Sequence, residues 1–308
     1  MPLTPTEKIW MDGRLVDWDD AKIHVLTHSL HYGMGVFEGI RAYPTSDGPA
    51  VFRLTDHIAR FFSGAHILGM VMPYSPAEII GAVNSVVKAS GLDACYIRPI
   101  AYLGYGEMGL NPMQCSVSVA VACWPWGAYL GDEGIANGIR LKVSSWARLD
   151  PRATPTAAKA TGAYINSSLA KVEAMLAGYD EAIMLTTEGL VSEGTGENVF
   201  VVRHGRLLTP PASAAGALEG ITADSVRTIA HDLGYEVAEV SLRRTDLYMA
   251  DEAFLTGTAA EVVPIASVDD RSVGAGKPGP MTKAIQEQFF HAVRGETGKY
   301  KDWVEHVT

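Results

Sequence analysis

The stretch TPTAAKATGAY, residues 154–164, holds one lysine, Lys159, among small and hydroxyl-bearing neighbours. Between Ala153 and Ala170 it is the only charged residue. Small neighbours let other groups approach closely, and the lack of nearby charge indicates a poorly hydrated amine. Because desolvation lowers the pKa of a lysine and makes its amine a better nucleophile, the stretch favours Schiff-base chemistry. The simpler alternative is a lysine on a small-residue loop that lies in water.

Such a lysine needs partner groups, and three segments that follow it in the chain, each typical of a turn, offer them. The segment SEGTGENVF (192–200) carries Glu193, Glu197 and Asn198 before a strand-like run, and a carboxylate at such a turn can keep a pyridine nitrogen protonated. GITADSV (220–226) begins an amphipathic helix with Thr222 at its start, which favours an anion. TGTAAEV (256–262) adds a second set of N–H and hydroxyl donors. Taken singly, each segment is also typical of an ordinary polar turn or a capped helix.

Arginines are the candidate anion contacts in the first half of the chain. They are Arg41, Arg60 and Arg98. Tyr96 and Arg98 belong to the strand-like run YIRP (96–99), where alternate residues point to the same face. Arg60 lies off the apolar face of a predicted helix, so core packing does not account for it. Each arginine, taken alone, could also be structural.

Apolar periodicity predicts strands and helices in both halves of the chain. In the first half we expect strands at 50–53, 96–103 and 116–124, and helices from Thr55 or Asp56 to about Met70 and from Ser75–Pro76 to Gly91. In the second half we expect strands at 139–145, 182–186, 198–203, 236–241 and 252–256, and helices at about 165–177, 222–234 and 281–294. The segment 124–138 is rich in glycine, proline and acidic residues, which indicates a connection. We therefore expect a small N-terminal domain (1–124), an interdomain loop (125–138) and a larger C-terminal domain (139–308).

Composition limits the function classes. The 308 residues are 47% hydrophobic and 19% charged, with a formal net charge of −10. Such an acidic chain has no general attraction to nucleic acid or to an anionic membrane. Its first residues do not form a secretory signal, and no stretch approaches the roughly 20 apolar residues of a membrane helix. The three cysteines form no CxxC pair. We expect a cytoplasmic globular protein without a metal site.

Taken together and in this order, the motifs resemble the class IV, fold-type IV aminotransferases, and within them the branched-chain amino-acid aminotransferases. The resemblance runs nearly end to end through HSLHYGMGVFEGIRAY (28–43), VFR (51–53), YIRP (96–99), GLNP (109–112), PWGAYLG (125–131), PTAAKATGAY (155–164), SEGTGENVF, GITADSV and LTGTAAEV (255–262). It implies an α/β fold with a small N-terminal α/β domain and a larger C-terminal mixed-sheet domain. It also implies that pyridoxal 5'-phosphate is the cofactor.

The resemblance assigns roles to matching positions. Lys159 holds the cofactor covalently and moves the α-proton of the substrate, Glu193 faces the pyridine nitrogen, and Tyr164 hydrogen-bonds the phenolic oxygen. The remaining assignments are Arg60, Ile221, Thr222 and Thr258 at the phosphate; Leu218 against the ring; Tyr32, Phe37, Trp126 and Tyr129 as the aromatic lining of the substrate pocket; and Tyr96, Arg98, Thr258 and Ala259 at the substrate carboxylates. The segment 210–222 is about one residue longer than the family pattern, which bears on the placement of Leu218.

The implied reaction is ping-pong transfer of an amino group between branched-chain L-amino acids and 2-oxoglutarate or glutamate. Its partners are small amino acids and 2-keto acids, and a homodimer or higher homo-oligomer is expected. D-amino-acid aminotransferases, (R)-amine transaminases and aminodeoxychorismate lyases share the lysine and the glutamate, but FEGIR, YIRP and PWGAYLG together favour the branched-chain enzymes. A binding or structural protein on the same fold is the alternative of another class, and the intact Lys159, Glu193, Arg60 and Tyr164 argue against it.

Overall fold

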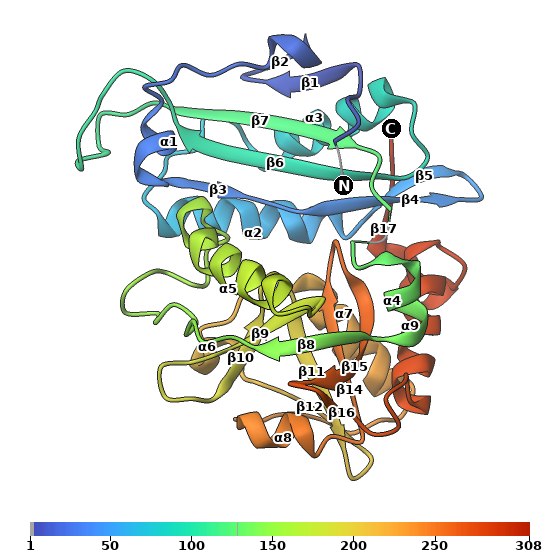
Figure 1. Cartoon of the computed structure of the whole chain (residues 1–308). Helices are drawn as coiled ribbons and strands as arrows, with labels where there is room; N and C mark the ends of the chain where they lie inside the picture. Colours follow the sequence, from blue (N-terminus) through green and yellow to red (C-terminus); the bar gives the residue numbers. More distant parts are fainter. Residues whose placement is uncertain (1–2, 128) are drawn as a thin grey trace. The chain divides into compact units, whose positions relative to one another are not determined.

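Two sheets, each with its own helices, form the core of the computed structural model, which describes residues 3–127 and 129–308 (Figure 1). One unit contains the chain up to Trp126 together with Ala158–Gly162 and Ala292–Thr308. The other contains Gly127–Ala157 and Ala163–His291. Ala128, in the motif PWGAYLG, lies outside the described residues. In the described part of the chain, every helix is too short or too polar to cross a bilayer.

The first unit is built on an antiparallel sheet with the strand order β17-β5-β4-β6-β7-β1-β2, and β3 pairs with β6. The strands are β1 (Lys8–Met11), β2 (Arg14–Asp17), β3 (Gly35–Phe37), β4 (Ile40–Thr45), β5 (Gly48–Phe52), β6 (Cys95–Leu103), β7 (Val117–Trp124) and β17 (Val304–His306). The strands predicted at 50–53, 96–103 and 116–124 are confirmed as β5, β6 and β7. The remaining strands were not predicted, because most of them carry too few residues for a periodic signal.

Two helices, α2 (Leu54–Ile67) and α3 (Pro76–Ser90), pack against this sheet, and shorter turns complete the unit. The turns are η1 (Trp18–Asp20), α1 (His28–Tyr32) and η3 (Gly298–Trp303). The start predicted for α3 is confirmed by a capping box in which Ser75 N donates to Glu78 Oε2 at 2.7 Å. The sequence predicts Thr55 or Asp56 as the cap of α2, and this prediction is wrong, because the helix begins at Leu54. Arg53 precedes the helix with φ 50°, and Thr55 N donates instead to Glu305 Oε1 at 2.7 Å.

The second unit is built on a mixed sheet with the strand order β10-β9-β8-β15-β14-β11-β12-β13, and β16 pairs with β15. The strands are β8 (Ile139–Val143), β9 (Glu181–Leu185), β10 (Val191–Gly194), β11 (Asn198–Arg203), β12 (Arg206–Thr209), β13 (Val237–Glu239), β14 (Glu252–Gly257), β15 (Glu261–Val268) and β16 (Arg271–Ser272). Strand β8 runs parallel to β9 and β15, whereas β14 runs antiparallel to both of its neighbours. The expected mixed sheet is confirmed.

Helices pack around this second sheet. They are α4 (Gly131–Asn137), α5 (Tyr164–Leu176), α6 (Ala212–Ala215), α7 (Ile221–Asp232), α8 (Arg244–Tyr248) and α9 (Pro280–Val293), and the short turn η2 (Thr161–Ala163) precedes α5. The helices predicted at about 165–177, 222–234 and 281–294 are confirmed as α5, α7 and α9. Their apolar faces supply buried residues such as Ala170, Ile229 and Ile285.

The structure differs from the expected domain bounds in three places. Residues Ala158–Gly162, expected in the C-terminal domain, belong to the first unit. The segment expected as an interdomain loop contains helix α4, because its glycines and acidic residues occupy a short turn-like helix with Asp132 and Glu133 in the first turn. The C-terminal segment belongs to the first unit, because β17 pairs with β5 and places Val304 opposite Phe52. A three-residue strand whose partner lies far away in the sequence has no local signal.

Candidate active site

The Lys159 segment is attached to strand β3 of the first unit. Phe37 N donates to the Lys159 carbonyl at 3.1 Å, and Ala160 forms a bridge with Val36. Lys159 is half-buried between two buried alanines, and its Nζ lies 5.2 Å from the centroid of the Phe37 ring. These contacts hold the lysine segment against β3 rather than on a free loop, and the poorly hydrated amine stays a prediction.

Two glycines allow this segment to approach the chain after α1. A Cβ at Gly33 would lie 2.9 Å from the Gly162 Cα, and a Cβ at Gly162 would lie 3.1 Å from the Gly33 carbonyl oxygen. Gly33 also has φ 69°, which favours glycine. Thr161 Oγ1 donates to the Gly33 carbonyl at 2.8 Å. The small residues around Lys159 therefore serve close backbone packing.

A buried carboxylate, Glu38, organises the side chains next to β3. Arg60 donates to it through Nε at 2.7 Å and through Nη2 at 2.8 Å, and His57 donates through Nδ1 at 2.9 Å. Burial acts to raise the pKa of Glu38, but the charge of Arg60 and the hydrogen bonds outweigh it and hold the pKa well below its usual range. Burial lowers the pKa of His57, so its ring is neutral at pH 7.

The motif FEG contains Glu38, but its residues alone assigned no role to this carboxylate. The available signal was one acidic residue inside the apolar run GVFEGI. A charged residue is almost never fully buried unless it is paired, so this residue indicated a buried partner. The structure also explains why Arg60 lies off the apolar face of α2, since its side chain turns to Glu38.

Aromatic rings surround Arg98 in the first unit. Its guanidinium carbon lies 4.6 Å from the Phe37 centroid and 5.2 Å from the Tyr96 centroid, and its Nη2 donates to the Tyr96 hydroxyl at 3.2 Å. Trp126 extends this group, with its ring centroid 4.5 Å from that of Tyr96. The prediction that Tyr96 and Arg98 share one face of a strand is confirmed.

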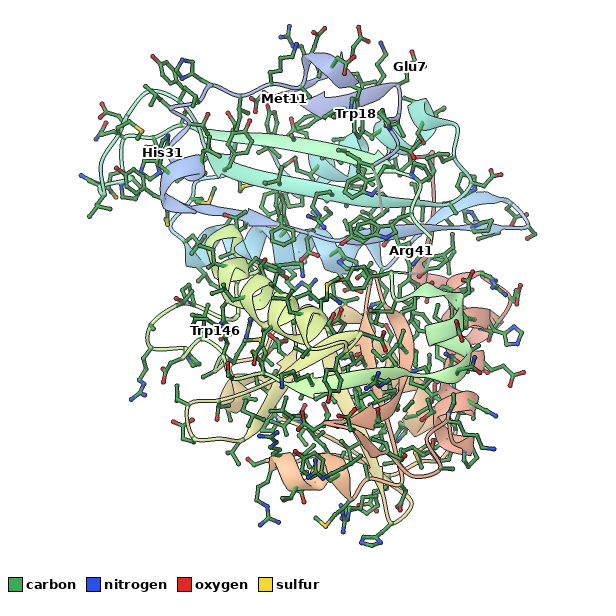
Figure 2. The ribbon with its side chains drawn as sticks, in the orientation of Figure 1. Glu7, Met11, Trp18, His31, Arg41 and Trp146 are labelled. Atoms are coloured by element: carbon green, nitrogen blue, oxygen red, sulfur yellow. The ribbon has the colours of Figure 1, made fainter. Side chains whose placement is uncertain are left out.

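Neighbouring residues fix this aromatic group. Gly39 leaves room for Tyr96, because a Cβ at position 39 would overlap the Tyr96 hydroxyl. Arg41, on β4 and labelled in Figure 2, donates from Nη2 to the Trp126 carbonyl at 3.2 Å. Tyr32, which was expected in the aromatic lining of the substrate pocket, lies on α1. Its side chain is 42% exposed, and its ring centroid is 4.7 Å from that of His28.

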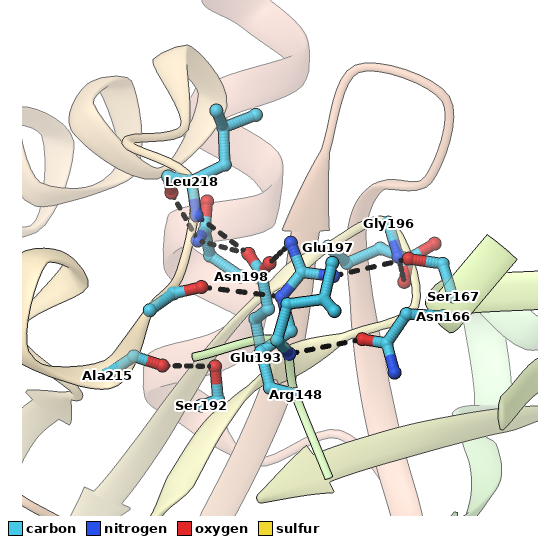
Figure 3. Close-up of polar contacts among 12 residues, drawn as sticks. Arg148, Asn166, Ser167, Ser192, Glu193, Gly196, Glu197, Asn198, Ala215 and Leu218 are labelled. Carbon is cyan, nitrogen blue, oxygen red and sulfur yellow. Dashed lines mark hydrogen bonds and ion pairs between the residues drawn. The ribbon is translucent and has the colours of Figure 1, made fainter. Parts of the chain in front are cut away.

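The second unit contains a buried ion pair between Arg148 and Glu193 (Figure 3). Arg148 Nη2 lies 2.8 Å from Glu193 Oε1. The other carboxylate oxygen accepts from Leu218 N at 3.1 Å and from Asn198 Nδ2 at 3.4 Å. The Asn198 amide also donates to the Leu218 carbonyl at 2.9 Å. These hydrogen bonds place Leu218 next to Glu193, although the segment 210–222 is longer than the family pattern.

Arg148 is a site residue that sequence reasoning missed. It lies in a polar stretch without periodicity, SSWARLDPR (144–152), and no spacing links it to Glu193. The rest of its guanidinium donates to the Gly216 carbonyl at 3.3 Å and to Ser167 Oγ at 3.4 Å. Figure 3 shows Arg148 pointing toward Glu193 from one side, with Asn198 and Leu218 on the other.

The two predicted phosphate turns lie in the second unit. Ile221 and Thr222 form the first turn of α7 and are buried, and the first N–H groups of a helix lack acceptors within that helix. Gly220 precedes them, and a Cβ at that position would overlap the Asn198 side-chain oxygen. The half-buried Thr258 and Ala259 lie between β14 and β15. The buried Thr256 hydroxyl, next to this turn, has no hydrogen-bond partner among the described residues.

These donor sets fit a phosphorylated pyridine. A paired carboxylate suits a protonated ring nitrogen, and a helix N-terminus and a glycine–threonine turn each offer donors that suit a phosphate. Tyr164 begins helix α5, and the ring centroid of Tyr129 lies 5.2 Å from Lys171 Nζ. Each predicted site residue therefore lies at a described position in either the first or the second unit.

A second acid network lies beside Glu193. Glu197 is buried, and burial together with the charge on Glu181 raises the pKa of Glu197 to about 8. Glu181 in turn pairs with Lys171 Nζ at 2.7 Å and accepts from Thr195 Oγ1 at 2.8 Å. Glu197 is therefore largely protonated at neutral pH, and it is the less suitable of the two segment carboxylates for pairing with a cation.

Comparison with known proteins agrees with this chemistry. The family described as amino-transferase class IV matches residues 35–268. The chain is similar to the branched-chain-amino-acid aminotransferase of Pseudomonas aeruginosa, with 48% identity over 96% of this chain and 95% of that protein. It is also similar to the Escherichia coli (strain K12) protein of the same name, with 46% identity over 100% and 99% of the two chains.

Solved structures give the same result. The Escherichia coli branched-chain amino acid aminotransferase has a TM-score of 0.96 and 46% identity, covering 99% of this chain and 100% of that chain. The T.th. branched-chain amino acid aminotransferase with pyridoxamine 5'-phosphate has a TM-score of 0.96 and 48% identity, covering 99% of both chains. The same T.th. enzyme complexed with N-(5'-phosphopyridoxyl)-L-glutamate has a TM-score of 0.94 and 46% identity over 99% of both chains.

Proposed function

Because this chain belongs to the class IV aminotransferases, we propose that it transfers the amino group between branched-chain L-amino acids and 2-oxoglutarate. Pyridoxal 5'-phosphate is the cofactor of this class. The observation that carries the substrate assignment is the position of Arg98 among the rings of Phe37, Tyr96 and Trp124. This arrangement combines an apolar wall with a cation, as two unlike substrates require.

The pocket residues divide the recognition of the two substrates. Burial of a full leucine or isoleucine side chain against aromatic rings contributes about 1.5–3 kcal/mol. The Arg98 guanidinium pairs with the distal carboxylate of glutamate through charge-assisted hydrogen bonds. Support comes from the Arg98 Nε, which is buried and has no hydrogen-bond partner among the described residues. Trp126, Tyr129 and the turn at Thr258–Ala259 complete the proposed substrate contacts.

When bound, the cofactor supplies a protonated pyridine ring that stabilises negative charge at the substrate α-carbon. Lys159 Nζ would hold the cofactor before the reaction, take the α-proton as general base and deliver it, as general acid, to the C4′ carbon of the cofactor. Glu193, fixed by Arg148, faces the ring nitrogen. Arg60, the amides of Ile221 and Thr222, and Thr258 hold the phosphate, Tyr164 donates to the phenolic oxygen, and Leu218 packs against the ring.

We also propose that the chain forms a homodimer or higher homo-oligomer. Support comes from large apolar side chains that face water in the first unit, including Leu110 at 85% and Met113 at 82% exposure. An apolar cavity of about 430 Å³ lies in the same unit and is lined by residues such as Ile23, Leu30 and Ile100. Such surfaces mark interaction sites. A cytoplasmic location is proposed as well, supported by three free thiols.

A half-reaction screen tests the proposed reaction. Purified enzyme is mixed singly with L-Leu, L-Ile, L-Val, L-Glu, D-Ala and (R)-1-phenylethylamine, and the visible spectrum of the bound cofactor is followed. The four L-amino acids are expected to convert the cofactor to its aminated form, whereas D-Ala and the amine leave it unchanged. Conversion by D-Ala in preference to L-Leu overturns the substrate assignment. A colourless protein that takes up no cofactor overturns the enzyme itself.

A further inference from the structure

Glu38 is completely buried, yet it bears a full negative charge next to the Lys159 segment. Its Oε1 accepts from Arg60 Nε, and its Oε2 accepts from Arg60 Nη2, His57 Nδ1 and, at 3.2 Å, Gly39 N. Burial of an ionised carboxylate is unfavourable unless such partners compensate it. Four donors on one carboxylate therefore indicate a group that is held in one place.

The contact between Glu38 and Arg60 fixes the orientation of the guanidinium. Two parallel hydrogen bonds to one carboxylate set the plane of the arginine head group as well as its position. The Nε–Nη2 edge faces Glu38, so the Nη1 end points away from that carboxylate. Arg60 itself rises from α2, one turn after His57, so helix and carboxylate hold it from two directions.

The same short segment also holds Lys159. Phe37 N donates to the Lys159 carbonyl at 3.1 Å, and Glu38 N donates to the Pro99 carbonyl at 2.9 Å. Phe37 thus holds the backbone of Lys159, and the next residue, Glu38, holds the head group of Arg60. A cofactor that is bound covalently at one end and through a phosphate at the other needs a constant spacing between these two groups.

We propose that Glu38 is a positioning residue, which orients Arg60 toward the cofactor phosphate and sets the spacing of Arg60 from Lys159. His57, neutral and hydrogen-bonded to the same carboxylate, also holds Glu38 in place through Oε2. This proposal rests on the proposed function, because it requires that Arg60 binds the phosphate. The Glu38 carboxylate touches Arg60 rather than the substrate, so its effect is expected in cofactor binding.

The test compares two cofactors that differ only in the phosphate. Full-length apo-protein is titrated with pyridoxal 5'-phosphate and, separately, with pyridoxal, and the dissociation constants are measured from the visible absorption of the bound aldehyde. Glu38→Gln is expected to weaken pyridoxal 5'-phosphate binding about tenfold or more, the range of a lost charge-assisted contact, while pyridoxal binding stays within about twofold. Arg60→Ala is expected to show the same selective loss, and the double variant no further loss.

Two further variants keep the test decisive. Arg60→Lys retains the positive charge beside Glu38, so folding is preserved, but a lysine cannot form the two parallel hydrogen bonds. It is expected to lose phosphate selectivity as Glu38→Gln does. Glu305→Gln is the matched control, because Glu305 hydrogen-bonds the first turn of the same helix at Thr55, more than one turn before Arg60. It is expected to leave both constants unchanged.

The outcomes separate the proposal from its premise. Unchanged selectivity in Arg60→Ala refutes the role of Arg60 at the phosphate and with it the basis of the proposal. Selective loss in Arg60→Ala, with wild-type binding in Glu38→Gln and Arg60→Lys, refutes only the positioning role. If Glu38→Gln weakens the binding of both ligands equally and Arg60→Lys keeps wild-type phosphate selectivity, the carboxylate has only a structural role. That outcome also refutes the positioning role.

Discussion

Arg148 and Glu193 form an ion pair in which Nη2 lies 2.8 Å from Oε1, and both side chains are more than nine-tenths buried. The pair lies at the start of the segment that the family resemblance assigns to the pyridine nitrogen. Arg148 therefore compensates the burial of the carboxylate and fixes its orientation at the same time. Neither effect requires Arg148 to touch the cofactor.

Replacement of Arg148 by methionine is expected to destabilise the fold by about 3–5 kcal/mol, because it leaves a buried charge without its partner. Urea denaturation of the purified variant measures this loss. The double variant Arg148→Met, Glu193→Gln removes the unpaired charge, so it is expected to regain part of the stability. A single variant as stable as the wild type contradicts the importance of the pair.

Replacement of Lys159 by alanine is expected to reduce transamination by roughly 100- to 10,000-fold or more, the range of general acid–base catalysis, while the protein still folds. Steady-state rates with L-Leu and 2-oxoglutarate, and thermal unfolding, provide the two measurements. Lys88→Ala, at the exposed end of α3, is the matched control and should keep full activity. Substantial turnover by the Lys159 variant would be incompatible with the assignment.

Much of the fold was predictable where periodicity is long. Strands β6 and β7 and helices α2, α3, α5, α7 and α9 each present one apolar face over several turns or alternations, so local sequence suffices. Strand β17 has only three residues, and its pairing with β5 depends on a distant segment. Helix α4 was missed because its glycines and acidic residues are typical of a loop.

The site was predictable only in part, for a similar reason. Lys159, Glu193 and Thr222 belong to local motifs whose chemistry can be inferred from neighbours. Glu38 and Arg148 gain their roles from partners that are distant in the sequence, and only the fold brings the charges together. An isolated acid in an apolar run was the one available signal for Glu38. Arg148 offered none.

Replacement of Arg98 by methionine is expected to separate the two substrates. The variant keeps an apolar side chain near Phe37 but loses the cation, so kcat/KM for glutamate and 2-oxoglutarate should fall about 10- to 100-fold more than kcat/KM for leucine. Single-turnover rates with each amino acid give the comparison. Equal losses for glutamate and leucine would instead place Arg98 at the carboxylate that both substrates share.

Replacement of Gly39 by alanine is expected to displace Tyr96, because the new methyl group would overlap the Tyr96 hydroxyl. Overpacking of this kind typically costs about 1–3 kcal/mol. The free energy of unfolding, measured by denaturation, should fall, and KM for leucine should change. The double variant Gly39→Ala, Tyr96→Phe removes the overlapping oxygen and should recover part of the stability, whereas no recovery would locate the strain elsewhere.

The protonated Glu197 predicts a pH dependence of stability. Its pKa is raised from the ordinary value of 4.5 to about 8, so the folded protein binds this proton more tightly than the unfolded chain does. Its contribution to stability is therefore largest at acidic pH and declines as pH rises from about 4.5 to about 8. Glutamine is neutral at every pH and lacks this decline.

Thermal unfolding of wild type and Glu197→Gln at acidic and alkaline pH measures this difference. Between about pH 6 and about pH 8.5, on either side of the raised pKa, the variant should gain a few degrees relative to wild type, roughly 1.5 °C per kcal/mol for a chain of 308 residues. Glu188→Gln, on an exposed turn, is the control and should track the wild type. A constant difference between Glu197→Gln and wild type at both pH values would mean that Glu197 is already ionised in the folded protein.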